Sequence, residues 1–301
     1  MGKFMHKRSI INSRRTQSKL LIVIALILSS VSAACGSIAQ VTNSDPDIPR
    51  NPYNGVKYFR EVRTEPRPMV IHVVRIDLKT AGIKLLVTPG EKDSELPFQA
   101  RTTSEFLDEF DLQIAINGDA FSPWYSLSIL AYFPHSGDFV DVRGHSVSNG
   151  VVYSTNDRRI PTLCTKKNNF GRIDPLCVPG FNSISGMNFL INDGKVVEDI
   201  DSSSPEPRTA VGLNKIGQQL FLLVVDGRQS GYSEGATFED LAAILLEYKA
   251  YRGFALDGGG STTLVMADEN GNPIVVNSPT HQGIPGRERP VGNHLGIYAN
   301  P

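Results

Sequence analysis

The chain has 301 residues, of which 40% are hydrophobic and 20% charged, as in an ordinary soluble globular protein. Its formal charge of −1 is unevenly distributed. Six of the 30 basic residues precede the first acidic residue, Asp45, which leaves 24 basic against 31 acidic residues, a charge of −7, for the remainder. No basic stripe or interleaved aromatic patch is left there, which argues against a nucleic-acid partner.

Residues 1–34 are predicted to be a signal peptide or an N-terminal anchor. A basic segment leads into the apolar run 20–28, and small residues follow it before Cys35. The run is too short to span a bilayer comfortably as a permanent helix. We therefore expect export, with membrane attachment through the N-terminus or through a lipidated Cys35 as the alternatives. Residues 35–57, rich in Ser, Asn, Asp and Pro, are expected to form a linker.

The other two cysteines are Cys164 and Cys177. In an exported protein, two neighbouring cysteines form a disulfide more often than a metal site, and no second Cys or His pair stands at zinc spacing. The expected Cys164–Cys177 disulfide would close a loop of about a dozen residues and stabilise the fold by ~3 kcal/mol.

The region from residue 58 onward shows strand, helix and hairpin signals in turn. Strands are predicted at 69–76, where His72 is expected to pack within the sheet, and at 82–88. A short helix follows a capping box at Thr102 and Glu105, and a strand covers 112–116. Residues 120–182 look like an irregular excursion. Hairpin signals then occupy 189–197, 208–225 and 264–276.

A second helix is predicted after Thr237, with Asp240 at the capping-box position and a stop at Arg252-Gly253. It links the strands 220–225 and 254–256 and is long enough for a crossover, although an antiparallel arrangement fits as well. The last strand is predicted at 296–298. We predict an α+β fold, a single domain over 58–301 with a large mixed sheet and few helices.

Three apolar strands are each followed by an aspartate beside a glycine, namely Asp119, Asp226 and Asp257. Strand ends that share one rim bring such carboxylates together. Asp257 opens the run Asp-Gly-Gly-Gly-Ser-Thr-Thr, in which glycines allow backbone amides to approach a ligand closely. The alternative is a glycine turn with a capping aspartate. The repetition of the pattern favours a site.

Arg208 and Arg228 extend this candidate site, because arginine holds carboxylate or phosphate oxygens bidentately. The alternative is that they form structural ion pairs with the acids. Ser261, Thr262 and the amides of 258–260 are suited to bind phosphate or sugar hydroxyls. No lysine follows the glycines at Walker spacing, and no serine-hydrolase elbow surrounds Ser261. The sequence requires no cofactor, although an acidic rim is compatible with calcium or another divalent ion.

Five motifs carry a resemblance to a known family. They are Asn117-Gly118-Asp119-Ala120-Phe121 and the segments 208–212, 226–235, 256–263 and 289–293. In this order they resemble the phosphodiester glycosidase family, over about residues 114–298. Ala120, where relatives often have an aromatic residue, and the cysteine-bearing insertion depart from the pattern. Both departures bear on the choice of substrate more than on the type of reaction.

The resemblance implies a hydrolase that cleaves the anomeric C–O bond of a sugar-1-phosphodiester and releases free sugar and a phosphomonoester, on envelope or exopolysaccharide material. A carboxylate must stabilise the oxocarbenium-like centre, as nucleophile or by activating water. The candidates are Asp257 and Asp226, with Asp119 and Glu234 as alternatives. The substrate-binding candidates are Asn117, Arg208, Arg228, Gly258, Gly259, Ser261 and Thr262.

Two other functions remain open from the sequence. The first is a non-catalytic phosphoglycan- or polysaccharide-binding module that uses the same rim. The second is a phosphodiesterase that cleaves the P–O bond. It ranks last, because the histidines show no grouping typical of a metal cluster.

Overall fold

The computed structural model describes residues 48–155, 160–175 and 180–301. The predicted signal peptide or anchor, Cys35 and Cys177 lie outside the described residues. Cys164 is buried in a strand, and its pairing with Cys177 stays a prediction.

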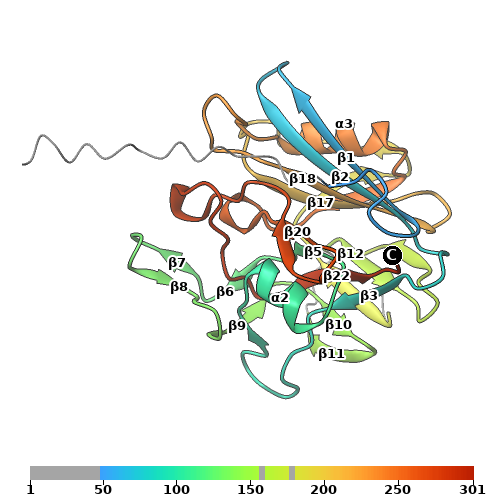
Figure 1. Cartoon of the computed structure of the whole chain (residues 1–301), viewed down its shortest axis with the longest axis vertical. Helices are drawn as coiled ribbons and strands as arrows, with labels where there is room; N and C mark the ends of the chain where they lie inside the picture. Colours follow the sequence, from blue (N-terminus) through green and yellow to red (C-terminus); the bar gives the residue numbers. More distant parts are fainter. Residues whose placement is uncertain (1–47, 156–159, 176–179) are drawn as a thin grey trace, which may run out of the picture. The chain divides into compact units, whose positions relative to one another are not determined.

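Two β-sheets stack face to face, and one helix covers the outer face of each sheet (Figure 1). The first sheet contains, in spatial order, β1 (Val56–Arg63), β2 (Met69–Asp77), β18 (Gln219–Val225), β17 (Arg208–Leu213), β19 (Arg252–Ala255), β15 (Phe189–Asn192) and β16 (Lys195–Val196). The second contains β21 (Pro273–Val275), β20 (Leu264–Ala267), β5 (Ile114–Asn117), β22 (His294–Tyr298) and β3 (Lys84–Val87). Helix α3 (Phe238–Glu247) covers the first sheet and α2 (Thr103–Glu109) the second.

Strand β2 shows why the two sheets stack. Its Ile71 and Val73 pack with α3 on one face, while Val74 and Ile76 pack between the sheets. Successive side chains of a strand point to opposite faces, so a strand buried on both sides reads as a continuous apolar run. The central layer between the sheets is therefore the main core of the domain.

The region 120–182, predicted to be irregular, contains a series of short paired strands, so that prediction is wrong. A third sheet contains β11 (Val151–Ser154), β10 (Ser146–Ser148), β14 (Asn182–Ser185), β12 (Thr162–Thr165) and β13 (Gly171–Ile173). A small sheet contains β4 (Phe98–Gln99), β9 (Phe139–Val142) and β6 (Phe121–Ser122), and β7 (Tyr125–Ser126) pairs with β8 (Tyr132–Phe133). Strands of two to four residues are too short to show a hydrophobic period.

The predicted capping boxes of both helices are confirmed. The side chain of Thr102 caps α2 together with Glu105, and Thr237 caps α3 together with Asp240. Each box satisfies backbone N–H groups that the first helical turn leaves without partners.

The predicted stop of the second helix is wrong. Helix α3 ends at Glu247, and Lys249 adopts the left-handed conformation with φ of 71°. Arg252 and Gly253 already belong to β19. A lysine therefore takes the backbone conformation that glycine usually supplies after a helix.

The connection from β18 through α3 to β19 is a crossover between two parallel strands. Strand β17 lies between them and pairs antiparallel with both. The α+β class with few helices is confirmed. Among the described residues, all named strands that pair directly are antiparallel to each other. The sheet is mixed only in the sense that strands such as β18 and β19 run parallel without pairing directly.

The segment before β1 packs on the domain, although it falls within the predicted linker. The Tyr53 hydroxyl donates to the carbonyl oxygen of Ala267 at 2.5 Å, and the Asn54 N–H donates to that of Asn300 at 2.8 Å. None of the helices described is long and apolar enough to cross a membrane.

Candidate active site

The candidate residues lie where strands of the two stacked sheets end on a common rim. In the second sheet, Asn117 at the end of β5 pairs with His294 at the start of β22. In the first sheet, Arg208 at the start of β17 pairs with Val225 at the end of β18, directly before Asp226. The acids that follow three strands are thereby brought to one side of the fold.

Asn117 ties three segments together and is fully buried. Its Nδ2 donates to the carbonyl oxygen of Asp257 at 2.8 Å. Its Oδ1 accepts from the hydroxyl of Thr209 at 2.7 Å and from the N–H of Thr263 at 3.2 Å. Because both polar atoms of its side chain are engaged in this way, Asn117 positions the loop that carries Asp257.

Asp257 and Asp119 lie on neighbouring backbone segments. The Asp257 N–H donates to the carbonyl oxygen of Gly118 at 2.9 Å, and Gly118 directly precedes Asp119. Oδ2 of Asp257 accepts a hydrogen bond from the Ser261 hydroxyl at 2.6 Å. Burial raises the pKa of Asp257, against the hydrogen bond from Ser261 and the nearby charge of Arg289.

Asp119 is buried, and its two carboxylate oxygens differ. Oδ1 accepts from the N–H of Ala120 at 2.8 Å, whereas the buried Oδ2 has no hydrogen-bond partner. Burial raises the pKa of this carboxyl to about 7, and the charge of Asp257 adds to the rise against the hydrogen bond from Ala120. Asp119 is therefore a carboxyl group that holds or loses its proton near neutral pH.

Each of the three glycines after Asp257 faces an arginine. A β-carbon on Gly258 would lie 3.6 Å from Cδ of Arg208, and one on Gly259 would lie 3.1 Å from a terminal nitrogen of Arg228. On Gly260 it would come within 2.5 Å of Nη2 of Arg289, a distance that real β-carbons do not tolerate. At Gly259 and Gly260 the absence of a side chain thus makes room for a guanidinium group. The N–H of Gly259 donates to the carbonyl oxygen of Pro207 at 2.8 Å, so this amide is engaged within the protein.

Arg289 is the arginine coupled most directly to Asp257. Its Nη1 donates to Oγ of Ser261 at 3.2 Å, and the same hydroxyl donates to Asp257. Its Nε donates to Nδ1 of His281 at 3.2 Å. Its Cζ lies 5.1 Å from the ring centre of Trp124, a cation–π contact.

Arg208 and Arg228 have protein partners as well. Arg208 lies over the ring of Phe238, with Cζ 4.1 Å from the ring centre, and donates to the carbonyl oxygen of Ala236 at 3.2 Å. Arg228 forms an ion pair with Glu206. The alternative that the arginines form structural ion pairs therefore holds in part for Arg228. The carboxylate that pairs with Arg228 is Glu206 and none of the three aspartates.

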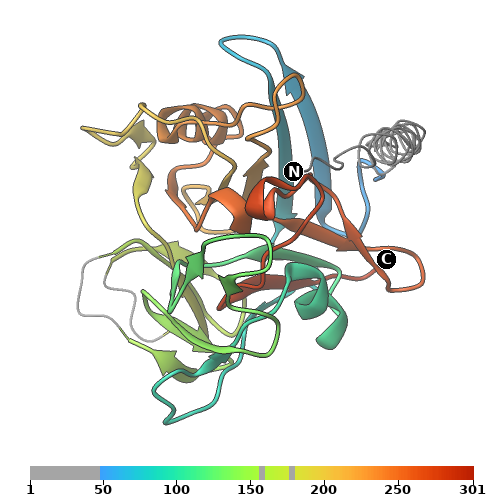
Figure 2. The same cartoon turned by 90° about the vertical axis from the view of Figure 1, so that its left-hand side faces the viewer.

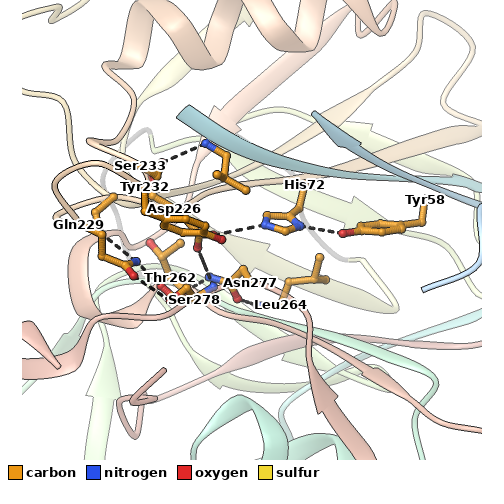
Figure 3. Close-up of polar contacts among 12 residues, drawn as sticks. Tyr58, His72, Asp226, Gln229, Tyr232, Ser233, Thr262, Leu264, Asn277 and Ser278 are labelled. Carbon is orange, nitrogen blue, oxygen red and sulfur yellow. Dashed lines mark hydrogen bonds and ion pairs between the residues drawn. The ribbon is translucent and has the colours of Figure 1, made fainter. Parts of the chain in front are cut away.

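Asp226 is fully buried and lies in a hydrogen-bond network of its own, which reaches the turn after Asp257 through Asn277, because Nδ2 of Asn277 also donates to the carbonyl oxygen of Thr262 at 3.2 Å (Figure 3). Oδ2 accepts from Nε2 of His72 at 3.3 Å and from the Tyr232 hydroxyl at 3.0 Å. Oδ1 accepts from Nδ2 of Asn277 at 2.9 Å and from the N–H of Ser278 at 2.8 Å. Burial alone would raise the pKa of Asp226, but the contacts with His72, Asn277 and Ser278 outweigh it and lower the pKa.

The other predicted residues occupy different environments. His72 is packed as expected, between Asp226 and the hydroxyl of Tyr58, which lies 2.8 Å from its Nδ1. Glu234 is exposed. Thr262 is buried, and its hydroxyl has no hydrogen-bond partner. In the ranges described, no three His, Cys, Asp or Glu side chains are grouped so as to hold a metal ion.

Comparison with known proteins supplies the family. The sequence model of the phosphodiester glycosidase family matches residues 110–298. The chain belongs to this family. No curated protein matches the sequence.

Three of the solved structures that match this chain show the fold that it shares with them. The catalytic domain of zebrafish N-acetylglucosamine-1-phosphodiester alpha-N-acetylglucosaminidase, auto-inhibited by its pro-peptide, superposes with a TM-score of 0.58 at 20% identity, over 81% of this chain and 82% of that one. A hypothetical protein from Synechocystis superposes with a TM-score of 0.61 at 13% identity, over 83% of this chain and 63% of that one. A protein from Burkholderia pseudomallei that is described as exported superposes with a TM-score of 0.55 at 14% identity, over 77% of this chain and 74% of that one.

Sequence reasoning missed two side chains of this site. Arg289 opens one of the family motifs, but nothing in its local sequence distinguishes a site arginine from a surface one. Trp124 is the only tryptophan of the chain. It stands in an uncharged stretch directly after the motif of Asp119, a signal that could have marked it.

Proposed function

We propose that this protein is an exported hydrolase that cleaves the anomeric C–O bond of a sugar-1-phosphodiester and releases free sugar and a phosphomonoester. The observation that carries the proposal is the adjacency of Asp257 and Asp119 beside the three arginines that face 258–260. Export is supported by the character of residues 1–34 and by the description of the Burkholderia relative as exported. Envelope or exopolysaccharide material is the proposed source of the substrate.

Asp257 is the proposed catalytic carboxylate at the anomeric carbon. Burial raises the pKa of Asp257, and the hydrogen bond from Ser261 and the charge of Arg289 act against that rise. An ionised carboxylate beside the sugar stabilises the positive charge that develops at C1, as nucleophile or by activating water. The C1–O bond breaks with its electron pair on the phosphate oxygen, and the oxygen of water ends on C1.

Asp119 is the proposed partner acid. With a pKa of about 7 it keeps its proton below neutral pH, and we assign the negative charge of the pair to Asp257, which accepts from the Ser261 hydroxyl that Arg289 also contacts. Enzymes commonly divide the roles of two carboxyls in this way, by environments that separate their pKa values. Asp226 suits this role less well, because it is fully buried and each of its carboxylate oxygens already accepts two hydrogen bonds.

The arginines are proposed to bind the phosphate. A phosphomonoester is a good leaving group, so cationic stabilisation of its developing charge contributes more than strong proton donation. Arg289 is the best placed, because it reaches Asp257 through Ser261. Arg208 and Arg228 lie at the neighbouring glycines of the same turn.

The test is product analysis with a defined diester. The purified chain is incubated with the methyl diester of N-acetylglucosamine 1-phosphate and with its glucose counterpart, and products are identified by phosphorus NMR and sugar analysis. Free sugar with methyl phosphate supports the proposal. Asp257→Asn should abolish turnover, while the control Glu269→Gln, at an exposed carboxylate, should not. Binding without turnover for every sugar tried would instead favour a phosphoglycan-binding module.

A further inference from the structure

The stretch between Asp119 and Asp138 contains no Asp, Glu, Lys or Arg. It forms the β7–β8 hairpin, which projects from the sheets in Figure 1 and is seen in Figure 2 from the side toward which it projects. Five exposed large hydrophobic side chains gather here, namely Trp124, Tyr125, Leu127, Ile129 and Leu130. Contiguous exposed apolar side chains on a soluble protein mark an interaction site.

The hairpin is braced so that its tip stays exposed. The rings of Tyr125 and Phe133 stack across its two strands, with centres 5.9 Å apart. The side chain of Gln282 donates to the carbonyl oxygen of Ser128 at 2.6 Å and fastens the tip to a neighbouring loop. Beyond this brace, Leu127 is 82% exposed and Leu130 is 89% exposed.

Cations lie at the base of the hairpin, beside its aromatic rings. Arg289 lies over Trp124, and Cζ of Arg287 lies 5.3 Å from the ring centre of Tyr132. Nη2 of Arg287 also donates to the Tyr132 hydroxyl at 3.3 Å. From its tip to its base the hairpin presents aliphatic side chains, then aromatic rings, then arginines. A lipid surface offers matching layers, with acyl chains for the aliphatic side chains, the interface for the aromatic rings and anionic headgroups for the arginines.

We propose that the β7–β8 hairpin docks on an anionic lipid surface, with Leu127, Ile129 and Leu130 inserted and Trp124 at the headgroup level. A second copy of the chain fits this hairpin less well, because symmetric pairing of two hairpins would bring the arginines at their bases toward each other. The other exposed large hydrophobic side chains of the described residues are Val62, Phe139, Val152, Phe170, Val196 and Ile216, which are spread over separate elements.

Docking would hold the candidate active site close to the lipid headgroups, because Arg289 contacts both Trp124 of the hairpin and Ser261 of the site. Three aliphatic side chains bind a bilayer only weakly, so stable attachment takes a second signal such as the neighbouring arginines. This docking goes beyond the proposed function, since hydrolysis of a soluble diester needs no membrane.

The single tryptophan supplies a direct test. Trp124 emission of the full chain reports on this hairpin whatever the N-terminal segment does, because the chain contains no other tryptophan. Vesicles of phosphatidylglycerol and phosphatidylethanolamine, with brominated acyl chains as quenchers, should shift the emission to the blue and quench it. Vesicles of phosphatidylcholine alone, with the same brominated acyl chains, should quench the Trp124 emission less. The double variant Leu127→Ser/Leu130→Ser should lose the quenching, while the control Val62→Ser/Ile216→Ser keeps it.

Two results would overturn the proposal. One is that brominated vesicles leave the wild-type emission unchanged, or that they quench the emission of the Leu127→Ser/Leu130→Ser variant as strongly as that of the wild type. The other is emission that changes with protein concentration without vesicles, together with a dimer in analytical ultracentrifugation that the double variant abolishes. Both substituted leucines are exposed, and circular dichroism checks that the variant is folded. No substrate is used, so this result is independent of the test for hydrolysis.

Discussion

Gly260 leaves the space that the guanidinium group of Arg289 occupies, since a β-carbon at this position would come within 2.5 Å of Nη2. Gly259 faces Arg228 in the same way, at 3.1 Å, whereas a β-carbon on Gly258 would meet the carbonyl oxygen of Pro207 at 2.9 Å and Arg208 only at an ordinary contact distance. The glycine run after Asp257 therefore works as a turn that admits positive charge beside a carboxylate. Arrangements of this kind stabilise charge that develops on a leaving phosphate.

A double-mutant cycle tests this relationship between glycine and arginine. Gly260→Ala should displace the Arg289 side chain and lower kcat/KM by roughly 10- to 100-fold, the loss expected for a hydrogen bond to a charged group. Arg289→Ala should lower it similarly. The double variant should be no worse than Arg289→Ala alone, because the space needed by the new methyl group is then free. Additive losses in the double variant would contradict the account.

The two carboxylates Asp226 and Asp257 should separate into a structural and a catalytic one. Asp226→Ala removes the buried carboxylate that His72, Tyr232 and Asn277 contact, so it should lower the free energy of unfolding by about 3–5 kcal/mol. Asp257→Asn should abolish turnover and leave urea unfolding nearly unchanged. A stable Asp226→Ala variant that folds normally but lacks activity would instead make Asp226 the catalytic acid.

Asp119 should give the protein a characteristic dependence of stability on pH. Its folded pKa of about 7 lies above the ordinary value of 3.8, so between these values the folded state binds a proton that the unfolded state has lost. Its contribution is therefore fully present below pH 3.8 and is lost as the pH rises through 7. The difference in unfolding free energy between wild type and Asp119→Asn should fall by up to ~1.4 kcal/mol per pH unit over this window.

The comparison with Asp119→Asn is needed because two buried histidines act in the opposite direction. Burial lowers the pKa of His281 to about 4 and that of His294 to about 3. Both contribute stability that rises with pH up to their ordinary value of 6.5, in wild type and variant alike. A difference between the two proteins that stays flat from pH 4 to 7 would mean that Asp119 ionises normally.

The sequence predicted local features well, because they depend on residues close together in the chain. The capping boxes at Thr102 and Thr237, and the hairpin with Asp193-Gly194 at its turn, are confirmed. Asp119 and Asp257 were both predicted as site candidates from their strand ends. Their adjacency depends on the pairing of Gly118 with Asp257, which are far apart in the sequence.

Features set by tertiary packing were beyond that reasoning. Asp226 shows the same local pattern as Asp257, and only the structure reveals the buried network with His72 that surrounds it. Arg289 reaches the site from a distant loop, and the stacking of Trp124 on it has no local signature. The end of α3 at Glu247 was missed because Lys249, which follows it, adopts a conformation usually assigned to glycine.

Hydrolysis in oxygen-18 water tests the central claim most directly, because it shows which bond breaks. The wild-type chain is incubated with the methyl diester of N-acetylglucosamine 1-phosphate, and the masses of both products are measured by mass spectrometry. Attack at the anomeric carbon predicts the label in the free sugar and an unlabelled methyl phosphate. Label in the phosphate product would mean that the P–O bond is cleaved, and would contradict the assignment of Asp257 to the anomeric carbon.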